Sequence, residues 1–280
     1  MYLYRHWWPD ATILGFDSFA GLPEEQSGEV RRATWNKGTF NVEATVYDRV
    51  LRDLGPSPLT QLYKGYFNES LTQRLGKRLS KQLPPATLVD IDSDIYVSAY
   101  QALDWLFTHK LIVPGTVVAY DDWADYVCSP MLTREELRSV PRRQVVDAMK
   151  MGIHKSRDPK QPPSELSKLV KASKAAERFP KLFAAGEPKA HLEITRKHNV
   201  QFRCLAGSCK AASSWKTCDP HKTYGAMFVV TAVGGEGPPQ HGVEMLDAQS
   251  GLKSFRKHNA ACVWVSEMRF STEAKDAPVV

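Results

Sequence analysis

The sequence predicts an α/β protein with a doubly wound, mostly parallel sheet. Three observations lead to this fold class. Short apolar runs alternate with segments of helical periodicity in the first half of the chain, which is typical of βαβ units with parallel strands. Two of these runs, 86–92 and 115–121, end on aspartates, and ligands bind at the carboxyl ends of strands in open α/β sheets. Three later apolar runs have no long helices between them, which favours an antiparallel end to the sheet.

The first half of the chain supplies the elements of the parallel part. Val42, Val46 and Val50 recur at helical spacing, and Gly55 followed by proline closes that helix. Two prolines at 84–85 separate the next helix from the strand that follows it. In chain order, strands are expected at 11–17, 59–64, 86–92 and 115–121, and helices at 2–8, 41–54, 69–82 and 96–109.

The alternation of strands and helices breaks after Asp122. Residues 126–184 are polar and basic, and we interpret them as an insertion. A helix is expected at 186–198, and the apolar runs 200–205, 226–233 and 261–270 are predicted to be antiparallel strands. The expected organisation is therefore a core at 1–125, a basic insertion at 126–184, and a C-terminal part at 185–280 that completes the sheet.

The chain is basic, with a net charge of +6 and a pI of about 9.0. Much of the excess lies between Arg134 and Lys181. Basic stretches bind nucleic acid or acidic lipid in some proteins, but this one has no pattern of aromatic residues interleaved with its charges and no nucleic-acid motif. We favour a solvated insertion and expect no nucleic-acid partner. No apolar run approaches the ~20 residues that span a bilayer, and the N-terminus has no signal-peptide pattern, so we expect a cytoplasmic protein without membrane contact.

Five cysteines occur in the chain. An odd count without a signal peptide argues against a disulfide framework. Cys204, Cys209, Cys218 and His221 offer enough ligands for a zinc site, but the first pair does not have the CxxC spacing. Ordinary thiols are favoured over a zinc site.

Four acidic residues follow two of the predicted strands. Asp92 and Asp94 come at the end of the first, and Asp121 and Asp122 at the end of the second. Adjacent strands lie about 4.8 Å apart, so neighbouring strands would crowd these carboxylates together. Like charges this close need a cation or raised pKa values. Oxygen-only ligands suit a hard divalent ion such as Mg²⁺.

Several short motifs occur in an order and spacing that match a known family. They are Gly15-Phe-Asp-Ser-Phe-Ala-Gly-Leu-Pro23, Lys64-Gly-Tyr-Phe67, Asp92-Ser-Asp-Ile-Tyr96, Pro114-Gly115 and Asp121-Asp122. With them the chain resembles the macrocin O-methyltransferase (TylF-like) family. The match covers roughly residues 2–124 and resumes weakly at 186–202. The resemblance implies a Rossmann-like fold of the class I methyltransferase type and transfer of a methyl group from S-adenosylmethionine to a hydroxyl, assisted by Mg²⁺.

The resemblance also implies roles for individual residues. Asp94 matches the general base, which would take the proton of the acceptor hydroxyl. A small hydroxylated molecule, such as a sugar on a natural product, would be the acceptor. Asp17 matches the acid that meets the ribose hydroxyls, a role that suits a carboxylate at a strand end. Ser18 and Gly65 lie in the motifs that contact the cofactor, and the metal ligands would be Asp92, Asp121 and Asp122.

One part of the family pattern is missing from the sequence. The family's first strand and its Gly-rich loop would lie before Met1, and no such loop occurs upstream of Asp17. The sequence therefore predicts a sheet without its usual central strand, either in a fragment or in a degenerate relative.

Two other functions remain open at this point. A non-catalytic or truncated relative would bind a partner through the basic insertion. A nucleotide-sugar glycosyltransferase would use an Asp-x-Asp pair to hold a metal and a diphosphate, although the motif around Phe16 argues against it. A phosphatase-like site is excluded because Tyr96 stands where a small hydroxyl residue is required.

Overall fold

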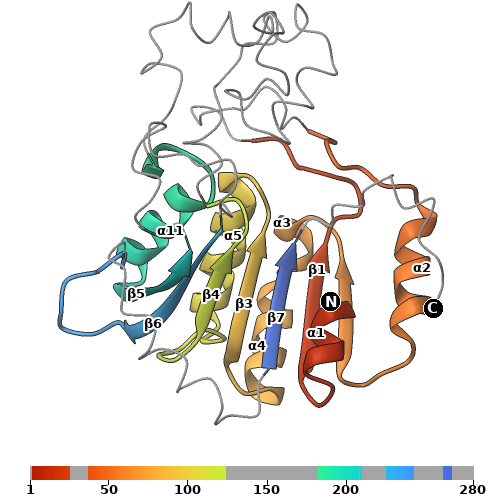
Figure 1. Cartoon of the computed structure of the whole chain (residues 1–280), viewed down its shortest axis with the longest axis horizontal. Coiled ribbons are helices and arrows are strands. Elements are labelled where there is room, and N and C mark those ends of the chain that lie inside the picture. The colour runs from red at the N-terminus through yellow and green to blue at the C-terminus, as the bar shows by residue number, and fades with distance from the viewer. Residues whose placement is uncertain are drawn as a thin grey trace, which may run out of the picture.

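The centre of the molecule is a seven-stranded sheet with the strand order β2-β1-β7-β3-β4-β6-β5 (Figure 1). The computed structural model describes residues 2–25, 37–123, 182–207, 209, 225–242 and 261–266. The strands are β1 Thr12–Asp17, β2 Thr60–Lys64, β3 Ala86–Asp92, β4 Val117–Tyr120, β5 Val200–Gly207, β6 Ala226–Val233 and β7 Ala261–Ser266.

The directions of the strands largely follow the prediction. Strands β2, β1, β7, β3 and β4 run parallel to one another. Strand β6 pairs antiparallel with β4, and β5 pairs antiparallel with β6. The mixed α/β class and the antiparallel end of the sheet, formed by β5 and β6, are confirmed.

Strand β7 contradicts the prediction for the last apolar run. It was expected at the antiparallel end, but it lies in the middle of the sheet, parallel to β1 on one side and β3 on the other (Figure 1). The run Ala261-Cys-Val-Trp-Val-Ser266 is apolar at nearly every position, which is typical of a central strand covered on both faces. The expectation that the sheet lacks a central strand is therefore also wrong, because the C-terminal strand occupies that place.

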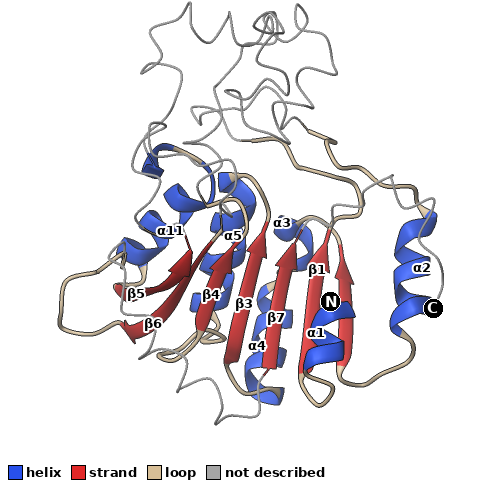
Figure 2. Cartoon of the chain, viewed as in Figure 1, coloured by secondary structure: helices blue, strands red, loops and turns tan. Residues whose placement is uncertain are grey.

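The described helices cover both faces of the sheet (Figure 2). Leu79, Leu103, Leu106 and Ile194 belong to the main core against one face, whereas Tyr4 packs near Leu88 on the other. None of the described helices combines the length and apolarity needed to cross a membrane. The helices are α1 Tyr2–Trp7, α2 Thr45–Leu54, α3 Phe67–Ser70, α4 Gln73–Gln82, α5 Tyr96–Thr108, the 3₁₀ helix η1 Leu182–Ala184 and α11 Gly186–Lys197.

The helix expected at 69–82 is two helices, α3 and α4. Thr72 separates them, and its side-chain oxygen accepts a hydrogen bond from the backbone N–H of Leu75 at 3.1 Å. A threonine at this position satisfies one of the N–H groups left open at a helix start. The threonine therefore begins a new helix where the apolar spacing alone suggested a continuous one.

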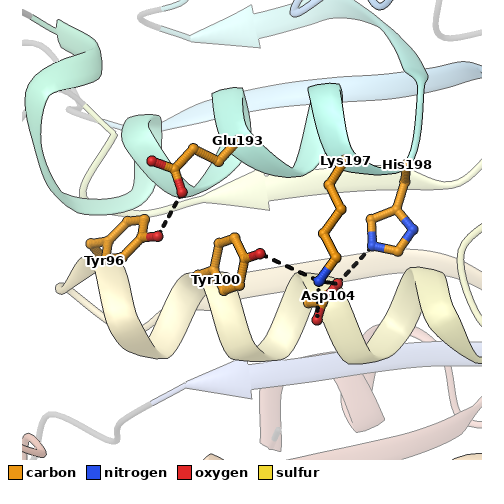
Figure 3. Close-up of polar contacts among 6 residues, drawn as sticks. All are labelled: Tyr96, Tyr100, Asp104, Glu193, Lys197 and His198. Atoms are coloured by element: carbon orange, nitrogen blue, oxygen red, sulfur yellow. Dashed lines mark hydrogen bonds and ion pairs between the residues drawn. The ribbon is translucent and has the colours of Figure 1, made fainter. Parts of the chain in front are cut away.

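Helix α11 packs along α5 through a row of polar contacts (Figure 3). The Tyr96 hydroxyl donates to Glu193 at 2.6 Å. Lys197 donates to Asp104 at 2.9 Å, and His198 contacts the other oxygen of the same carboxylate at 2.7 Å. Burial alone would raise the pKa of Asp104, but the hydrogen bonds from Lys197 and His198 lower it below its usual value. These contacts fix the position of α11 along α5.

A disulfide joins Cys204 and Cys209, with their Cα atoms 6.2 Å apart. Strand β5 ends at Gly207, whose φ is 85°, so the chain turns and Cys209 comes back beside Cys204. The preference for ordinary thiols is wrong for this pair, and a zinc site that includes both residues is also excluded, because each sulfur is bonded to the other. Cys218 and His221 lie outside the described residues.

The predicted division of the chain at residues 125 and 184 stays a prediction. Most of the expected basic insertion, 126–184, falls outside the described residues, so its structure stays a prediction. Strand β7 belongs to the C-terminal part of the sequence but pairs with two strands of the N-terminal part. The N-terminal and C-terminal parts are thus one sheet rather than separate units.

Candidate metal and cofactor site

The parallel strands end at one edge of the sheet, the upper edge in Figure 1. Phe16 of β1 is level with Val265 of β7, and Asp92 of β3 is level with Ser266. Asp17, the next residue of β1, therefore ends its strand at the same height as Asp92. One strand lies between them, so their strand ends are about 10 Å apart. The carboxyl end of β7 lies between the two predicted halves of the site.

Three of the predicted metal ligands come together at this edge. Asp92, Asp121 and Asp122 each place one carboxylate oxygen within 4.8 Å of the others. The N–H of Asp121 donates to the carbonyl of Ile91 at 3.1 Å, which holds the end of β4 against the end of β3. Asp92 is half-buried, Asp121 exposed and Asp122 buried. Oxygens bound to one Mg²⁺ at about 2.1 Å lie at most ~4.2 Å apart, so small side-chain movements bring these three into range.

Asp94, the predicted general base, lies just beyond the trio in an unusual conformation. Its φ is 58°, the left-handed region that asparagine and aspartate tolerate better than other residues with a side chain. Its side chain has no exposed surface. An acceptor hydroxyl that reaches this carboxylate must therefore displace the groups that cover it.

Glu187 is a fourth carboxylate at the site, and the sequence analysis did not single it out. It is fully buried in the first turn of α11. Its carboxylate accepts the backbone N–H groups of Ser93 at 3.4 Å and Asp122 at 3.1 Å. An acid in the first turn of a helix is usually explained by the helix dipole alone, and the weak resemblance at 186–202 includes this residue without giving it a role.

The electrostatic position of Glu187 is unfavourable without a cation. Burial raises the pKa of Glu187 well above its usual value, and the nearby carboxylates of Asp122, Asp92 and Asp94 raise it further. The N–H of Ser93 acts in the opposite direction. A group of carboxylates in which one has a raised pKa has the electrostatics expected of a cation site.

The predicted cofactor residues lie at the ends of β1 and β2. Asp17 is 3% exposed, and its Oδ1 accepts the N–H of Phe19 at 2.6 Å. The Asp17 carbonyl accepts the N–H of Gly65 at 3.0 Å, which joins the two loops. Ser18 donates its hydroxyl to the carbonyl of Gly21 at 2.9 Å. Asp17 and Ser18 thus shape the loop after β1, and their contact with a cofactor stays a prediction.

A cavity of about 260 Å³ opens beside this loop. It is lined by residues from the loops after β1 and β2 and from the start of α5, among them Ser18, Tyr66, Ser98 and Gln101. Glu25 fixes the loop after β1 over α5, because its carboxylate accepts the N–H groups of Tyr96 at 3.1 Å and Val97 at 3.3 Å. The space is near the lower size limit of small-molecule sites.

His191 lies one helical turn after Glu187 in α11, and its role is structural. It is fully buried beside the rings of Trp123 and Phe228. The Nε2 atom donates to the carbonyl of His241 at 2.9 Å, so Nδ1 accepts from the Tyr120 hydroxyl at 2.8 Å. Both nitrogens are engaged by the protein, which leaves neither for a metal.

The burial of His191 predicts a specific loss of stability in acid. Burial lowers the pKa of His191 from 6.5 to about 3. The unfolded chain therefore takes up a proton below pH 6.5 that the folded chain does not. The contribution of this group to stability is complete above pH 6.5 and falls by about 1.4 kcal/mol per pH unit as the pH drops towards 3. Urea unfolding at several pH values between 4 and 7 measures this slope.

The variant His191→Gln isolates the effect. It should be less stable at pH 7, by about 1–3 kcal/mol, because buried partners lose their hydrogen bonds. Its stability should also vary less with pH than that of the wild type. His6→Gln, at an exposed position of α1, is the control and should keep the wild-type slope. An unchanged slope in His191→Gln would show that His191 is not the group that titrates.

Comparison with known proteins gives one distant structural likeness. No family model matches the chain, and no curated protein matches it. A solved structure of CalS11, a calicheamicin methyltransferase, matches with a TM-score of 0.33 and 21% sequence identity. The match covers 39% of this chain and 44% of that chain. Because this likeness spans less than half of either protein, the function has to be argued from the site.

Proposed function

We propose that the protein is an S-adenosylmethionine-dependent, divalent-metal-assisted O-methyltransferase that acts on a hydroxyl of a sugar or another small natural product. The observation that carries the proposal is the convergence of Asp92, Asp121 and Asp122 at the carboxyl edge of the parallel sheet. Asp94 follows directly in the chain. This is the place where open α/β sheets bind their ligands.

The residues present fit a divalent metal such as Mg²⁺. The trio supplies only carboxylate oxygens, the donors that hard divalent ions prefer. A bound Mg²⁺ would be held by Asp92, Asp121 and Asp122 and would lower the pKa of a hydroxyl that binds to it. The same positive charge would relieve the repulsion among the acidic groups around Glu187.

Asp94 is the residue we assign as general base. In the transfer, the acceptor oxygen forms a bond to the methyl carbon, the sulfur–carbon bond of the sulfonium breaks, and the proton of the hydroxyl passes to the Asp94 carboxylate. The product is then a neutral thioether and a methyl ether. Alignment of the reacting atoms supplies much of the rate in such a reaction.

The cofactor would lie along the edge towards β1. Asp17 would accept hydrogen bonds from the two ribose hydroxyls, and the loops that carry Ser18 and Gly65 would contact the adenine side of the cofactor. The cavity next to Ser18 and Tyr66 supports this placement. Strand β7 also supports it, because the sheet has a central strand that ends between Asp17 and Asp92. One of the two reasons to expect a non-catalytic remnant, the missing central strand, is thereby removed. The other remains, because no Gly-rich loop occurs upstream of Asp17.

Calorimetric titration with S-adenosylhomocysteine and with Mg²⁺ tests the proposal. We expect the purified chain to bind both. Loss of a residue that hydrogen-bonds to a metal ligand weakens metal affinity about 10–100-fold. Loss of a ligand itself, in Asp122→Asn, should therefore weaken Mg²⁺ binding at least tenfold. Asp121→Asn should behave in the same way.

The matched control is Asp90→Asn, the same change two residues before Asp92. The Asp90 carboxylate accepts the Tyr4 hydroxyl at 2.6 Å, and an asparagine oxygen still accepts this bond. Mg²⁺ affinity should stay at the wild-type value. If Asp122→Asn and Asp121→Asn bind Mg²⁺ as tightly as the wild type, the ligand assignment is wrong. If the wild type does not bind S-adenosylhomocysteine, the methyltransferase proposal fails.

A further inference from the structure

We propose that Glu187 is the positioning residue of the metal centre and sets the separation between the ligands of β3 and β4. This inference rests on the metal site of the proposed function. Ser93 directly follows the ligand Asp92, and Asp122 is itself a ligand. One carboxylate accepts the N–H of both, at 3.4 Å and 3.1 Å, and so joins the two strand ends that carry the site.

The geometry separates this role from that of a ligand. Each carboxylate oxygen of Glu187 accepts a different backbone N–H. Within the described part of the chain, the group with metal-binding spacing contains Asp92, Asp121 and Asp122 but not Glu187. Glu187 therefore acts on the metal through the backbone of its ligands.

The position of Glu187 is set by the helix that carries it rather than by the acidic groups. Gly186, with a φ of 60°, starts α11, and the next residue points its side chain at the strand ends. Further along the helix, Glu193 and Lys197 bind α5 (Figure 3). Because α11 is held at several points, the bridge between the two strands is built into the fold before any ion binds.

The test measures binding of Mn²⁺ alone by its electron paramagnetic resonance signal. Glu187→Gln keeps the size of the side chain, but its amide presents only one acceptor to the two N–H groups. We expect its Kd for Mn²⁺ to rise about 10–100-fold, the effect of losing an outer-shell partner. Glu187→Asp keeps the carboxyl group but is too short to bridge both strands, and its Kd should rise about tenfold on the same basis.

The matched control is Glu193→Gln, which makes the same change on the same helix. Glu193 binds the Tyr96 hydroxyl and forms an ion pair with Lys189 at 3.2 Å, so its replacement disturbs the packing of α11 but not the strand ends. Its Kd for Mn²⁺ should equal that of the wild type. The second measurement is the Tm of the Glu187 variants without and with Mn²⁺. A purely structural role of Glu187 would lower both Tm values equally. The proposed role predicts that adding Mn²⁺ raises the Tm less in the variants than in the wild type.

The outcomes distinguish this inference from the proposed function. Wild-type affinity for Mn²⁺ in both Glu187 variants would overturn the positioning role. A wild type that binds no Mn²⁺ would overturn the metal site and this role together. Binding of Mn²⁺ that depends on Glu187, in a chain that does not bind S-adenosylhomocysteine, would support the positioning role and overturn the methyltransferase proposal.

Discussion

A chain that ends at Ala260 is expected to lose its cooperative unfolding transition. The change removes β7, which pairs at five positions with β1 and at six with β3. No other strand links the β2-β1 pair to the rest of the described sheet. Without β7 the sheet therefore falls into two parts, each with an open edge.

The size of the effect follows from the hydrogen bonds of two ladders. Each intramolecular hydrogen bond contributes a net ~1 kcal/mol, and two ladders of this length contain on the order of ten. Their loss is comparable to the whole stability of a domain, about 5–15 kcal/mol. Circular dichroism during thermal unfolding should show a broad or absent transition in the shortened chain.

The control for this experiment ends at Ser266 and keeps the whole of β7. It should retain a cooperative transition, which would assign the loss to the strand rather than to the removal of C-terminal residues in general. A chain ending at Ala260 that unfolds cooperatively at the wild-type Tm would contradict the central position of β7.

Replacement of Asp94 by asparagine is expected to reduce methyl transfer by about 10²–10⁴-fold, the usual contribution of a general base. Binding of Mg²⁺ and of S-adenosylhomocysteine should change little, because neither is assigned to Asp94. The substitution suits this position, since the φ of 58° is one that asparagine adopts readily. The measurement is S-adenosylhomocysteine release with a hydroxylated acceptor that supports turnover by the wild type.

Asp94→Ala distinguishes the loss of the general base from the effect of backbone strain at this position. The alanine variant also lacks the base, and the left-handed conformation in addition destabilises its folded state by about 1–2 kcal/mol. We expect the same reduction in turnover in both variants and a lower Tm only in Asp94→Ala. Undiminished turnover in Asp94→Asn would exclude Asp94 as the base.

The sequence predicted the local elements of this fold well. The apolar spacing of α5 and the acidic ends of β3 and β4 are short-range patterns, and the structure has these elements close to the expected ranges. Asp92, Asp121 and Asp122 were expected to meet, and they do. Hydrophobic periodicity predicts the elements directly, and acids at the ends of strands predict the position of the site.

The features that sequence reasoning missed depend on contacts between distant residues. The periodicity of 261–266 predicts a strand but not its neighbours or its direction, because pairing with β1 and β3 is decided by the whole sheet. Glu187 resembles any acid at a helix start until its helix is packed beside β3 and β4. The bond between Cys204 and Cys209 depends on the turn after β5, which no count of cysteines reveals.

The place of β7 has a consequence for synthesis of the protein on the ribosome. Strand β1 begins at Thr12 and its central partner at Ala261, so at about 5–20 residues per second the nascent chain waits on the order of 10–50 s for that partner. From its own synthesis until β7 emerges, each of β1 and β3 presents an edge with unpaired N–H and C=O groups, and such edges are templates for pairing with other chains. Aggregation during translation, and the demand for chaperones, should therefore be governed by the delay before β7 emerges.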